Sequence, residues 1–276
     1  MSVPTLSIAL MAVAMVFAFA VPIVLLVYYK KKGAQILPFF IGCAVFIVFA
    51  LILESLVHNL VLKGLPVGEK IVGNTLLYAL YALYGGLMAG LFEETGRFVA
   101  FKTVLKKRQD NDRNALMYGA GHGGVEAILM LGFAYASNLV VAAMINMGLA
   151  DKLTAGLSGD MLSQVQGIFD TLTTTPASTY LLAIVERCVA IATHISLSVL
   201  VWFAAKKPGK LWLYPLAILL HAALDGVLVI LAARLSIPAV EGCLVLTLVP
   251  IVLIACAVWK RERNSSAVSE ICPAGK

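Results

Sequence analysis

Charged residues are scarce in this chain of 276 residues, because aspartate, glutamate, lysine and arginine make up only 13% of it and hydrophobic residues make up 61%. Soluble domains contain about 25% charged residues, so the composition excludes an ordinary water-soluble globular protein. The apolar residues recur along the whole chain in runs long enough to cross a bilayer, with short polar interruptions. We therefore expect an all-α, polytopic bundle of membrane helices.

Cysteine is also sparse, and its pattern excludes two further classes of protein. The five cysteines are odd in number, and no two of them stand in CxxC spacing: Cys43, Cys188, Cys243, Cys256 and Cys272. This excludes a disulfide framework and a zinc ribbon. The formal net charge of +6 does not indicate a nucleic-acid partner, because the basic residues fall between the apolar runs rather than on one face. They are better interpreted as signals of membrane topology.

Seven apolar runs predict about seven transmembrane helices. These cover residues 4–28, 37–62, 71–101, 114–145, 180–205, 211–233 and 239–259. With the amino terminus outside, fifteen lysines and arginines fall in cytoplasmic segments, four fall on the opposite side and two lie within spans. This asymmetry predicts the N-out, C-in orientation.

The spans predict a single transmembrane domain over residues 1–259, followed by a short basic cytoplasmic tail over 260–276. One external segment, 146–179, is long, and its apolar residues recur at helical spacing between polar ones. That pattern predicts an amphipathic helix at the membrane surface. The ionisable residues inside the spans place a catalytic core within residues 71–233.

Ionisable side chains inside membrane spans cost at least about 2.5–3.5 kcal/mol each at mid-helix, so they mark functional sites by default. The third to sixth spans carry such groups at a similar depth, in the cytoplasmic half or near the midplane. They are Glu93, Glu94 and Arg97 on the third span, His122 and Glu126 on the fourth, His194 on the fifth, and His221 and Asp225 on the sixth. We predict that they converge on one site.

Spacing within the helices orders these groups further. Residues four apart share a helix face, which pairs His122 with Glu126 and His221 with Asp225. Arg97 can reach the two glutamates that precede it on its own helix, and its guanidinium can hold one carboxylate in the ionised form. We expect Glu126, Asp225, Arg97 and His194 to support the site rather than to carry out its chemistry.

A buried carboxylate beside several imidazoles is suited to hydrolysis, because the carboxylate can deprotonate water while the histidines orient it. The preferred interpretation requires no cofactor. The same groups could also bind Zn²⁺, for which imidazole and carboxylate are normal ligands, and the ligands would then be His122, His194 and His221. The helix signature with two histidines flanking a glutamate is absent. The residues themselves leave both mechanisms open.

Three short motifs resemble those of a known group of proteases. They are Glu93-Glu94-Thr95-Gly96-Arg97, Tyr118-Gly-Ala-Gly-His122 and His221-Ala-Ala-Leu-Asp225. Their order is similar to the three-motif core of the CAAX-protease and bacteriocin-processing superfamily of glutamate-dependent intramembrane proteases. The Glu-Glu-x-x-Arg spacing and Glu126 also resemble the related PrsW proteases. Within this group the chain most resembles the bacterial YhfC family of intramembrane proteases, and the resemblance covers residues 71–233.

The resemblance implies a glutamic intramembrane endopeptidase of a bacterial cytoplasmic membrane. In such an enzyme Glu93 or Glu94 activates water and His122 and His221 assist. Asp225 supports them, in the place where the CAAX enzymes usually have asparagine. The implied partner is a membrane-embedded or membrane-associated peptide or protein substrate, which enters laterally or from the cytoplasmic side.

Two other function classes fit part of the pattern. Buried acid and histidine chains also serve as proton relays in transporters, although the internal repeat that many transporters show is not detectable here. A scaffold that has kept the fold without activity is the third hypothesis, and it gives no reason for the glutamate pair.

Four further ionisable residues lie toward the outer ends of two spans. Glu54 and His58 stand four residues apart on the second span, and Glu186 and Arg187 are adjacent on the fifth. The sequence predicts a structural ion cluster that links these two helices rather than a second active site.

Overall fold

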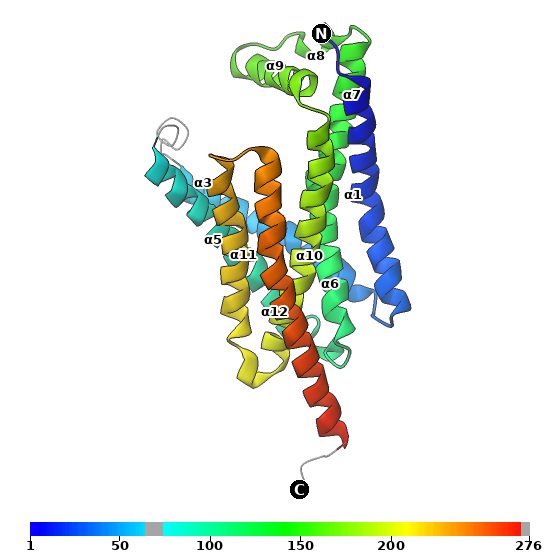
Figure 1. The fold of residues 1–276 in the computed structure, drawn as a ribbon, viewed down its shortest axis with the longest axis vertical. Coiled ribbons are helices and arrows are strands. Elements are labelled where there is room, and N and C mark those ends of the chain that lie inside the picture. Colours follow the sequence, from blue (N-terminus) through cyan, green and yellow to red (C-terminus); the bar gives the residue numbers. More distant parts are fainter. Residues whose placement is uncertain (64–73, 272–276) are drawn as a thin grey trace. The chain divides into compact units, whose positions relative to one another are not determined.

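A computed structural model describes residues 1–63 and 74–271 of the chain, and every regular element in these residues is helical (Figure 1). The elements are α1 (Thr5–Lys31), α2 (Leu37–Val45), η1 (Phe46–Glu54), α3 (Ser55–Leu62), α5 (Thr75–Lys102), η2 (Lys106–Arg108), α6 (Arg113–Ala127), η3 (Ile128–Phe133), α7 (Ala134–Asn146), α8 (Ala150–Thr154), α9 (Gly159–Thr174), α10 (Ser178–Lys206), η4 (Pro208–Lys210), α11 (Leu213–Ala232) and α12 (Ile237–Ile271). The segments η1 and η3 are π-helical, and η2 and η4 are single 3₁₀ turns.

Seven helices within residues 1–63 and 74–271 are long and apolar enough to cross a membrane. They run over Thr5–Lys31, Leu37–Leu62, Thr75–Lys102, Arg113–Asn146, Ser178–Lys206, Pro208–Ala232 and Ile237–Arg263. The prediction of an all-helical, seven-span integral membrane protein is confirmed. The expected start of the third span at residue 71 and the end of the tail, residues 272–276, lie outside the described residues. The N-out, C-in orientation stays a prediction.

The chain forms two compact units. The first unit contains residues 1–23 and 126–188, and the second contains residues 24–125 and 189–276. The expectation of a single transmembrane domain over residues 1–259 stays a prediction.

In the first unit, the long segment 146–179 contains the helices α8 and α9. The apolar face of α9 buries Phe169 and Leu172 in a cluster with side chains of α1 and α7. Asn146, at the end of α7, fixes the start of the chain, because the backbone N–H of Val3 donates to its Oδ1 at 2.7 Å and its Nδ2 donates to the Val3 carbonyl at 3.0 Å. These contacts tie α9, α1 and α7 together.

In the second unit, glycines let α5 and α11 pack backbone against backbone. A Cβ atom on Gly86 would lie 2.5 Å from the backbone nitrogen of Gly226, and one on Gly90 would lie 2.6 Å from the carbonyl oxygen of Ile218. Small residues at such contacts allow transmembrane helices to approach closely. The close approach brings the glutamate pair of α5 beside the histidine of α11.

Glycines of α6 perform the same role on two sides of that helix. A Cβ atom on Gly121 would lie 2.0 Å from the carbonyl oxygen of Phe39 on α2, and one on Gly119 would lie 2.5 Å from the Cα atom of Ile195 on α10. His122 stands beside both contacts, so α6 presents its imidazole between α2 and α10.

Candidate functional site

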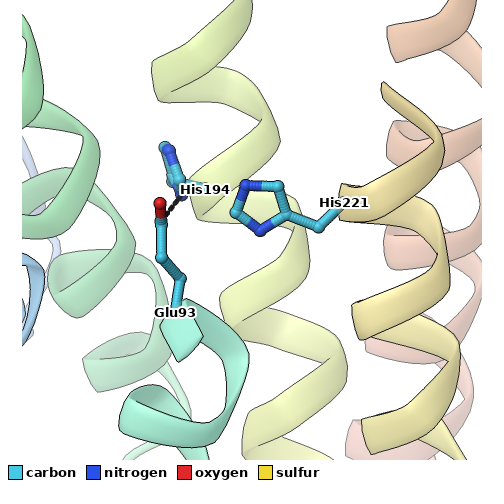
Figure 2. A group of neighbouring side chains, drawn as sticks. All are labelled: Glu93, His194 and His221. Atoms are coloured by element: carbon cyan, nitrogen blue, oxygen red, sulfur yellow. Dashed lines mark ion pairs between the residues drawn. The ribbon is translucent and has the colours of Figure 1, made fainter. Parts of the chain in front are cut away.

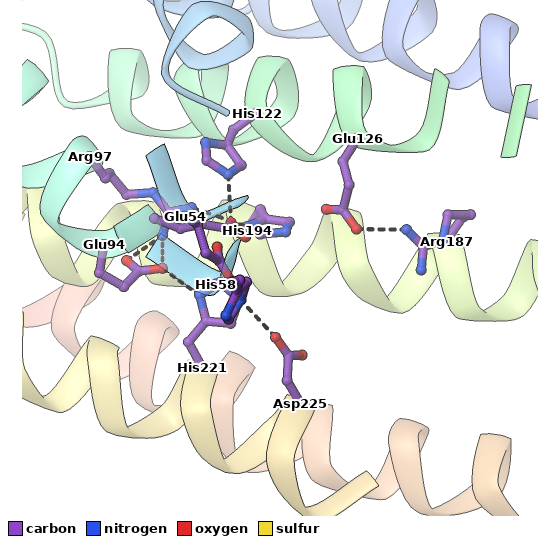
Figure 3. A network of polar contacts seen from close by, with 11 residues as sticks. Glu54, His58, Glu94, Arg97, His122, Glu126, Arg187, His194, His221 and Asp225 are labelled. Atoms are coloured by element: carbon purple, nitrogen blue, oxygen red, sulfur yellow. Dashed lines mark hydrogen bonds and ion pairs between the residues drawn. The ribbon is translucent and has the colours of Figure 1, made fainter. Parts of the chain in front are cut away.

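Six ionisable side chains meet inside the second unit, where α5, α6, α10 and α11 pack together (Figure 3). All six are buried: Glu93, Glu94 and Arg97 from α5, His122 from α6, His194 from α10 and His221 from α11. The structure thus brings together all four residues predicted to be catalytic and two of the four predicted to support them.

Glu94 lies in the completely buried part of this cluster. The Nη1 atom of Arg97 donates to both of its carboxylate oxygens, and both side chains are fully buried. The Nδ1 atom of His221 lies 2.8 Å from Glu94 Oε1. A buried carboxylate needs a charged partner and hydrogen bonds to be tolerated, and Glu94 has both. Glu94 therefore anchors Arg97 and His221.

Glu93 faces the imidazole rings instead. Its Oε2 atom lies 2.9 Å from His122 Nε2 and 3.9 Å from His194 Nδ1. Its side chain is 10% exposed, whereas that of Glu94 is completely buried. Of the two neighbouring glutamates, Glu93 is the one placed to reach a ligand or a substrate.

His194 lies beside Arg97 and the other two imidazoles. The Nη2 atom of Arg97 lies 3.1 Å from His194 Nδ1, and because a guanidinium only donates, this nitrogen accepts. The ring centroid of His194 lies 4.6 Å from that of His122 and 5.4 Å from that of His221. The three imidazoles therefore form one contiguous group.

Three residues of this group could hold a metal ion (Figure 2). Glu93, His194 and His221 each offer one ligand atom, and these atoms all lie within 4.8 Å of one another. Tetrahedral zinc with ligands at about 2.1 Å holds neighbouring ligand atoms about 3.4 Å apart. A metal ion would compete with Arg97 for the lone pair of His194 Nδ1. The donor set of one carboxylate and two imidazoles fits zinc, with Glu93 in the place that the sequence-based alternative gave to His122.

Comparison with known proteins identifies the family. The family model of the YhfC intramembrane metalloproteases matches residues 17–245. The chain belongs to this family. A relative from Bacillus subtilis (strain 168), described as "Uncharacterized membrane protein YhfC", is 39% identical over 217 residues, which cover 78% of this chain and 81% of the relative. No solved structure matches the chain.

The family description bears on one expectation in particular. Members of the YhfC family are described as metalloproteases, so the expectation that the site requires no cofactor is not supported. The donor set of Glu93, His194 and His221 agrees with that description. The wider kinship with CAAX and PrsW proteases, and the glutamic type of catalysis, stay predictions.

The two remaining supporting residues of this YhfC-family chain have different surroundings. Asp225 Oδ2 lies 3.4 Å from His221 Nε2, so this carboxylate stands beside the histidine one turn away, as its spacing predicts. Glu126 contacts Arg187 instead, with its Oε1 atom 2.6 Å from Arg187 Nη1. Among the described residues, no group hydrogen-bonds His122 Nδ1. The structure therefore gives Glu126 a partner other than the histidine that it was expected to orient.

Glu54, His58 and Tyr84 form a further polar group in the second unit, and the sequence pattern indicated only the first two of them. His58 Nε2 lies 3.0 Å from Glu54 Oε1, as the four-residue spacing suggests, and His58 Nδ1 lies 3.1 Å from the hydroxyl of Tyr84 on α5. Arg187 contacts Glu186 and Glu126. The expected ion cluster that links the two helices stays a prediction, because the two pairs belong to different units. No motif in the sequence singles out Tyr84.

Proposed function

We propose that the chain is an intramembrane endopeptidase that uses a divalent metal ion, with Zn²⁺ as the best fit, held by Glu93, His194 and His221. The observation that carries this proposal is that one ligand atom from each of these residues lies within 4.8 Å of the other two. The three residues come from three different helices and are buried. The family description supports the same reaction class.

A bound zinc ion would supply Lewis-acid polarisation of the scissile carbonyl. The chain's own residues prepare the site for it. With the proton of His221 on Nδ1 and donated to Glu94, the lone pair of the ring lies on Nε2. Arg97 balances the charge of Glu94, and His122 holds one oxygen of Glu93. These contacts fix the orientation of the ligand groups before a substrate arrives.

A second candidate mechanism keeps the same reaction without a metal. Glu93 Oε2 lies 2.9 Å from His122 Nε2 and 3.9 Å from His194 Nδ1, which suits a carboxylate that deprotonates water beside imidazoles that orient it. In this mechanism Glu93 is the base, and Glu94 keeps its place beside Arg97. Hydrolysis that survives complete removal of metal would favour it.

The proposed substrate is a peptide bond within a membrane-embedded or membrane-associated protein or peptide of a bacterial cytoplasmic membrane. The proposed ligands lie on helices that are long and apolar enough to cross a membrane, which supports a substrate of this kind. Movement of a solute or of protons by the purified protein in liposomes, without any peptide cleavage, would instead favour the transporter. Absence of both activities and of metal would favour the scaffold.

Metal binding tests the centre directly. Purified protein in detergent is titrated with Zn²⁺, and elemental analysis measures the bound ion. We expect one zinc per chain for the wild type and loss of binding for Glu93→Gln and for His194→Asn. Asp170→Asn, on the exposed side of α9, serves as the matched control and retains binding. Equal zinc content in all four proteins would contradict the assignment of these ligands.

Cleavage is tested without knowing the substrate in advance. Bacterial membranes that contain the wild type or Glu93→Gln are compared by mass spectrometry of newly formed protein amino termini. We expect new termini within or beside membrane spans of other proteins only with the wild type. If the zinc-loaded wild type and the variant give the same termini, the endopeptidase proposal is wrong.

A further inference from the structure

A hydrogen-bonded row of side chains leads away from the site in the second unit. The hydroxyl of Tyr84 lies 3.1 Å from His58 Nδ1, and His58 Nε2 lies 3.0 Å from Glu54 Oε1. With the ring proton on Nε2, the imidazole donates to the carboxylate and accepts from the hydroxyl, so each contact is satisfied. Asp225 Oδ2 lies 3.4 Å from His221 Nε2, and Glu54 and His58 belong to the same network of polar side chains (Figure 3). The row therefore continues to the candidate metal centre.

Two side chains of this row are far more exposed than the residues at the centre of the site. The side chains of His221 and Glu94 are 4% and 0% exposed, whereas those of His58 and Asp225 are 29% and 40% exposed. Polar groups that face acyl chains within a membrane span carry a high energetic cost. Those of the row therefore require water or another polar partner beside them.

The other side of the site is closed by packed aromatic rings. We call the end of the second unit that carries Lys102, Lys106, Lys107 and Lys206 the basic end. Between the site and this end, Phe101, Tyr118 and Trp202 are completely buried. The Phe101 ring centroid lies 4.7 Å from that of Tyr118 and 5.0 Å from that of Trp202. This packing closes the site toward the basic end, and the polar row offers a hydrophilic approach among the residues that the structure describes.

We propose that Tyr84, His58, Glu54 and Asp225 form an entry arm, along which an extended segment of the substrate reaches the site from the end opposite the basic end. The inference rests on the proposed endopeptidase function. An unwound peptide in a membrane presents backbone N–H groups that need acceptors, and the two carboxylates supply them. Nine residues separate Tyr84 from Glu93 on α5, which is about 14 Å of helix and matches about four extended residues.

Accessibility to a water-soluble reagent tests the direction of entry. Single cysteines replace His58 or Asp225 in a variant whose own cysteines are changed to serine, and a charged, membrane-impermeant maleimide labels them in sealed vesicles of both orientations. Leu56→Cys is the matched control, because Leu56 lies on the same helix as His58 and is 54% exposed but apolar. Lys63→Cys marks the end opposite the basic end, and Gly209→Cys marks the basic end. Size-exclusion chromatography selects the variants that fold.

We expect His58→Cys and Asp225→Cys to react at least tenfold faster than Leu56→Cys, from the same side as Lys63→Cys. Labelling from the side of Gly209→Cys, or a rate equal to that of Leu56→Cys, would overturn the entry arm. Either cysteine variant suffices, so failure of one to fold leaves the test intact.

A second experiment tests whether a peptide occupies the entry arm, by asking whether it protects a cysteine there from labelling. Unfolded β-casein is added as a probe without metal, so binding is measured without cleavage. We expect it to slow the labelling of His58→Cys at least threefold and to leave Lys63→Cys unchanged. Unchanged labelling of both would mean that the arm admits water only, which overturns the inference. If the wild type cleaves membrane proteins but the His58→Cys protein shows no such protection, the proposed function stands and the entry arm does not.

Discussion

Each unit of the protein holds an arginine paired with a glutamate, and the two pairs differ in their burial and in their further partners. In the second unit, Arg97 pairs with Glu94, and this carboxylate also contacts the imidazole of His221. In the first unit, Arg187 lies 2.6 Å from Glu126 and 2.5 Å from Glu186, so the arginine joins two carboxylates. An ion pair within a membrane span is therefore not sufficient to indicate chemistry. The link to an imidazole cluster is what distinguishes the pair in the second unit.

The largest expected effect comes from removing the arginine of the second unit. Arg97→Met leaves the fully buried Glu94 without its charged partner, and breaking such a pair costs about 3–5 kcal/mol. It also removes the guanidinium that positions Glu94 beside His221, one of the proposed ligands. We expect a loss of that size in the free energy of unfolding, measured in mixed detergent micelles, together with loss of zinc binding.

The matched change in the first unit is Arg187→Met. Its side chain and that of Glu126 are 13% and 15% exposed, so the unpaired carboxylate is better solvated and the loss of stability is smaller. We expect this variant to bind zinc as the wild type does. Loss of zinc binding in both variants would remove the distinction between the two pairs.

Replacing the glutamates themselves sharpens the comparison with less damage to the fold. Glu94→Gln keeps the shape of the side chain but weakens its hold on His221, and loss of such a partner of a metal ligand typically lowers metal affinity 10- to 100-fold. Glu126→Gln alters only the pair of the first unit, so we expect its zinc affinity to stay within twofold of the wild type. Calorimetric titration of both variants with Zn²⁺ measures the difference. Equal losses of affinity would show that Glu126 also supports the centre.

The spans could be predicted from the sequence, because bilayer thickness sets the length of an apolar run. The meeting of the ionisable groups could be predicted too, because four spans carry them at similar distances from their ends. The rotation of each helix about its own axis could not be predicted. Glu93 and Glu94 are adjacent, yet side chains on an α-helix turn by about 100° per residue, so one faces the imidazoles and the other faces Arg97. The packing of α5 decides which glutamate contacts the imidazoles and which contacts Arg97, and the sequence does not show it.

Contacts between helices account for the remaining differences. Glu126 stands one turn from His122 in the sequence, but Arg187 on another helix offers it a full charge, which is a stronger partner than a neutral ring. Tyr84 is likewise brought to His58 by the packing of α3 and α5. Spacing along one helix predicts which groups share a face, and it does not predict which residue of another helix will compete for them.

Glycine substitutions compare the packing of the two units. A Cβ atom on Gly86 in the second unit would meet backbone at 2.5 Å, whereas one on Gly132 in the first unit would meet the side chain of Phe19 at 3.0 Å. Backbone cannot move aside as a ring can, so we expect Gly86→Ala to lose about 1–3 kcal/mol of stability and Gly132→Ala to lose less. Gly85→Ala is the control, because nothing lies within 4 Å of its added Cβ. Thermal unfolding in detergent ranks the three variants, and a Gly86→Ala protein as stable as the control would contradict close packing of α5 on α11.

The smallest expected effect lies in the first unit, at the contact between Asn146 and the start of the chain. Asn146→Ala removes both hydrogen bonds to the backbone of Val3, each worth about 0.5–1.5 kcal/mol. We expect a total loss of about 1 kcal/mol in the free energy of unfolding, the lower end of this sum, because Asn146 is exposed and water can replace its contacts. Zinc affinity stays unchanged, because the candidate ligands all belong to the second unit. Ser137→Ala, an exposed position on the same helix α7, is the matched control for stability. A change in zinc affinity in Asn146→Ala alone would show that the metal centre depends on the folding of the first unit, and the two units would then have to be treated as one functional body.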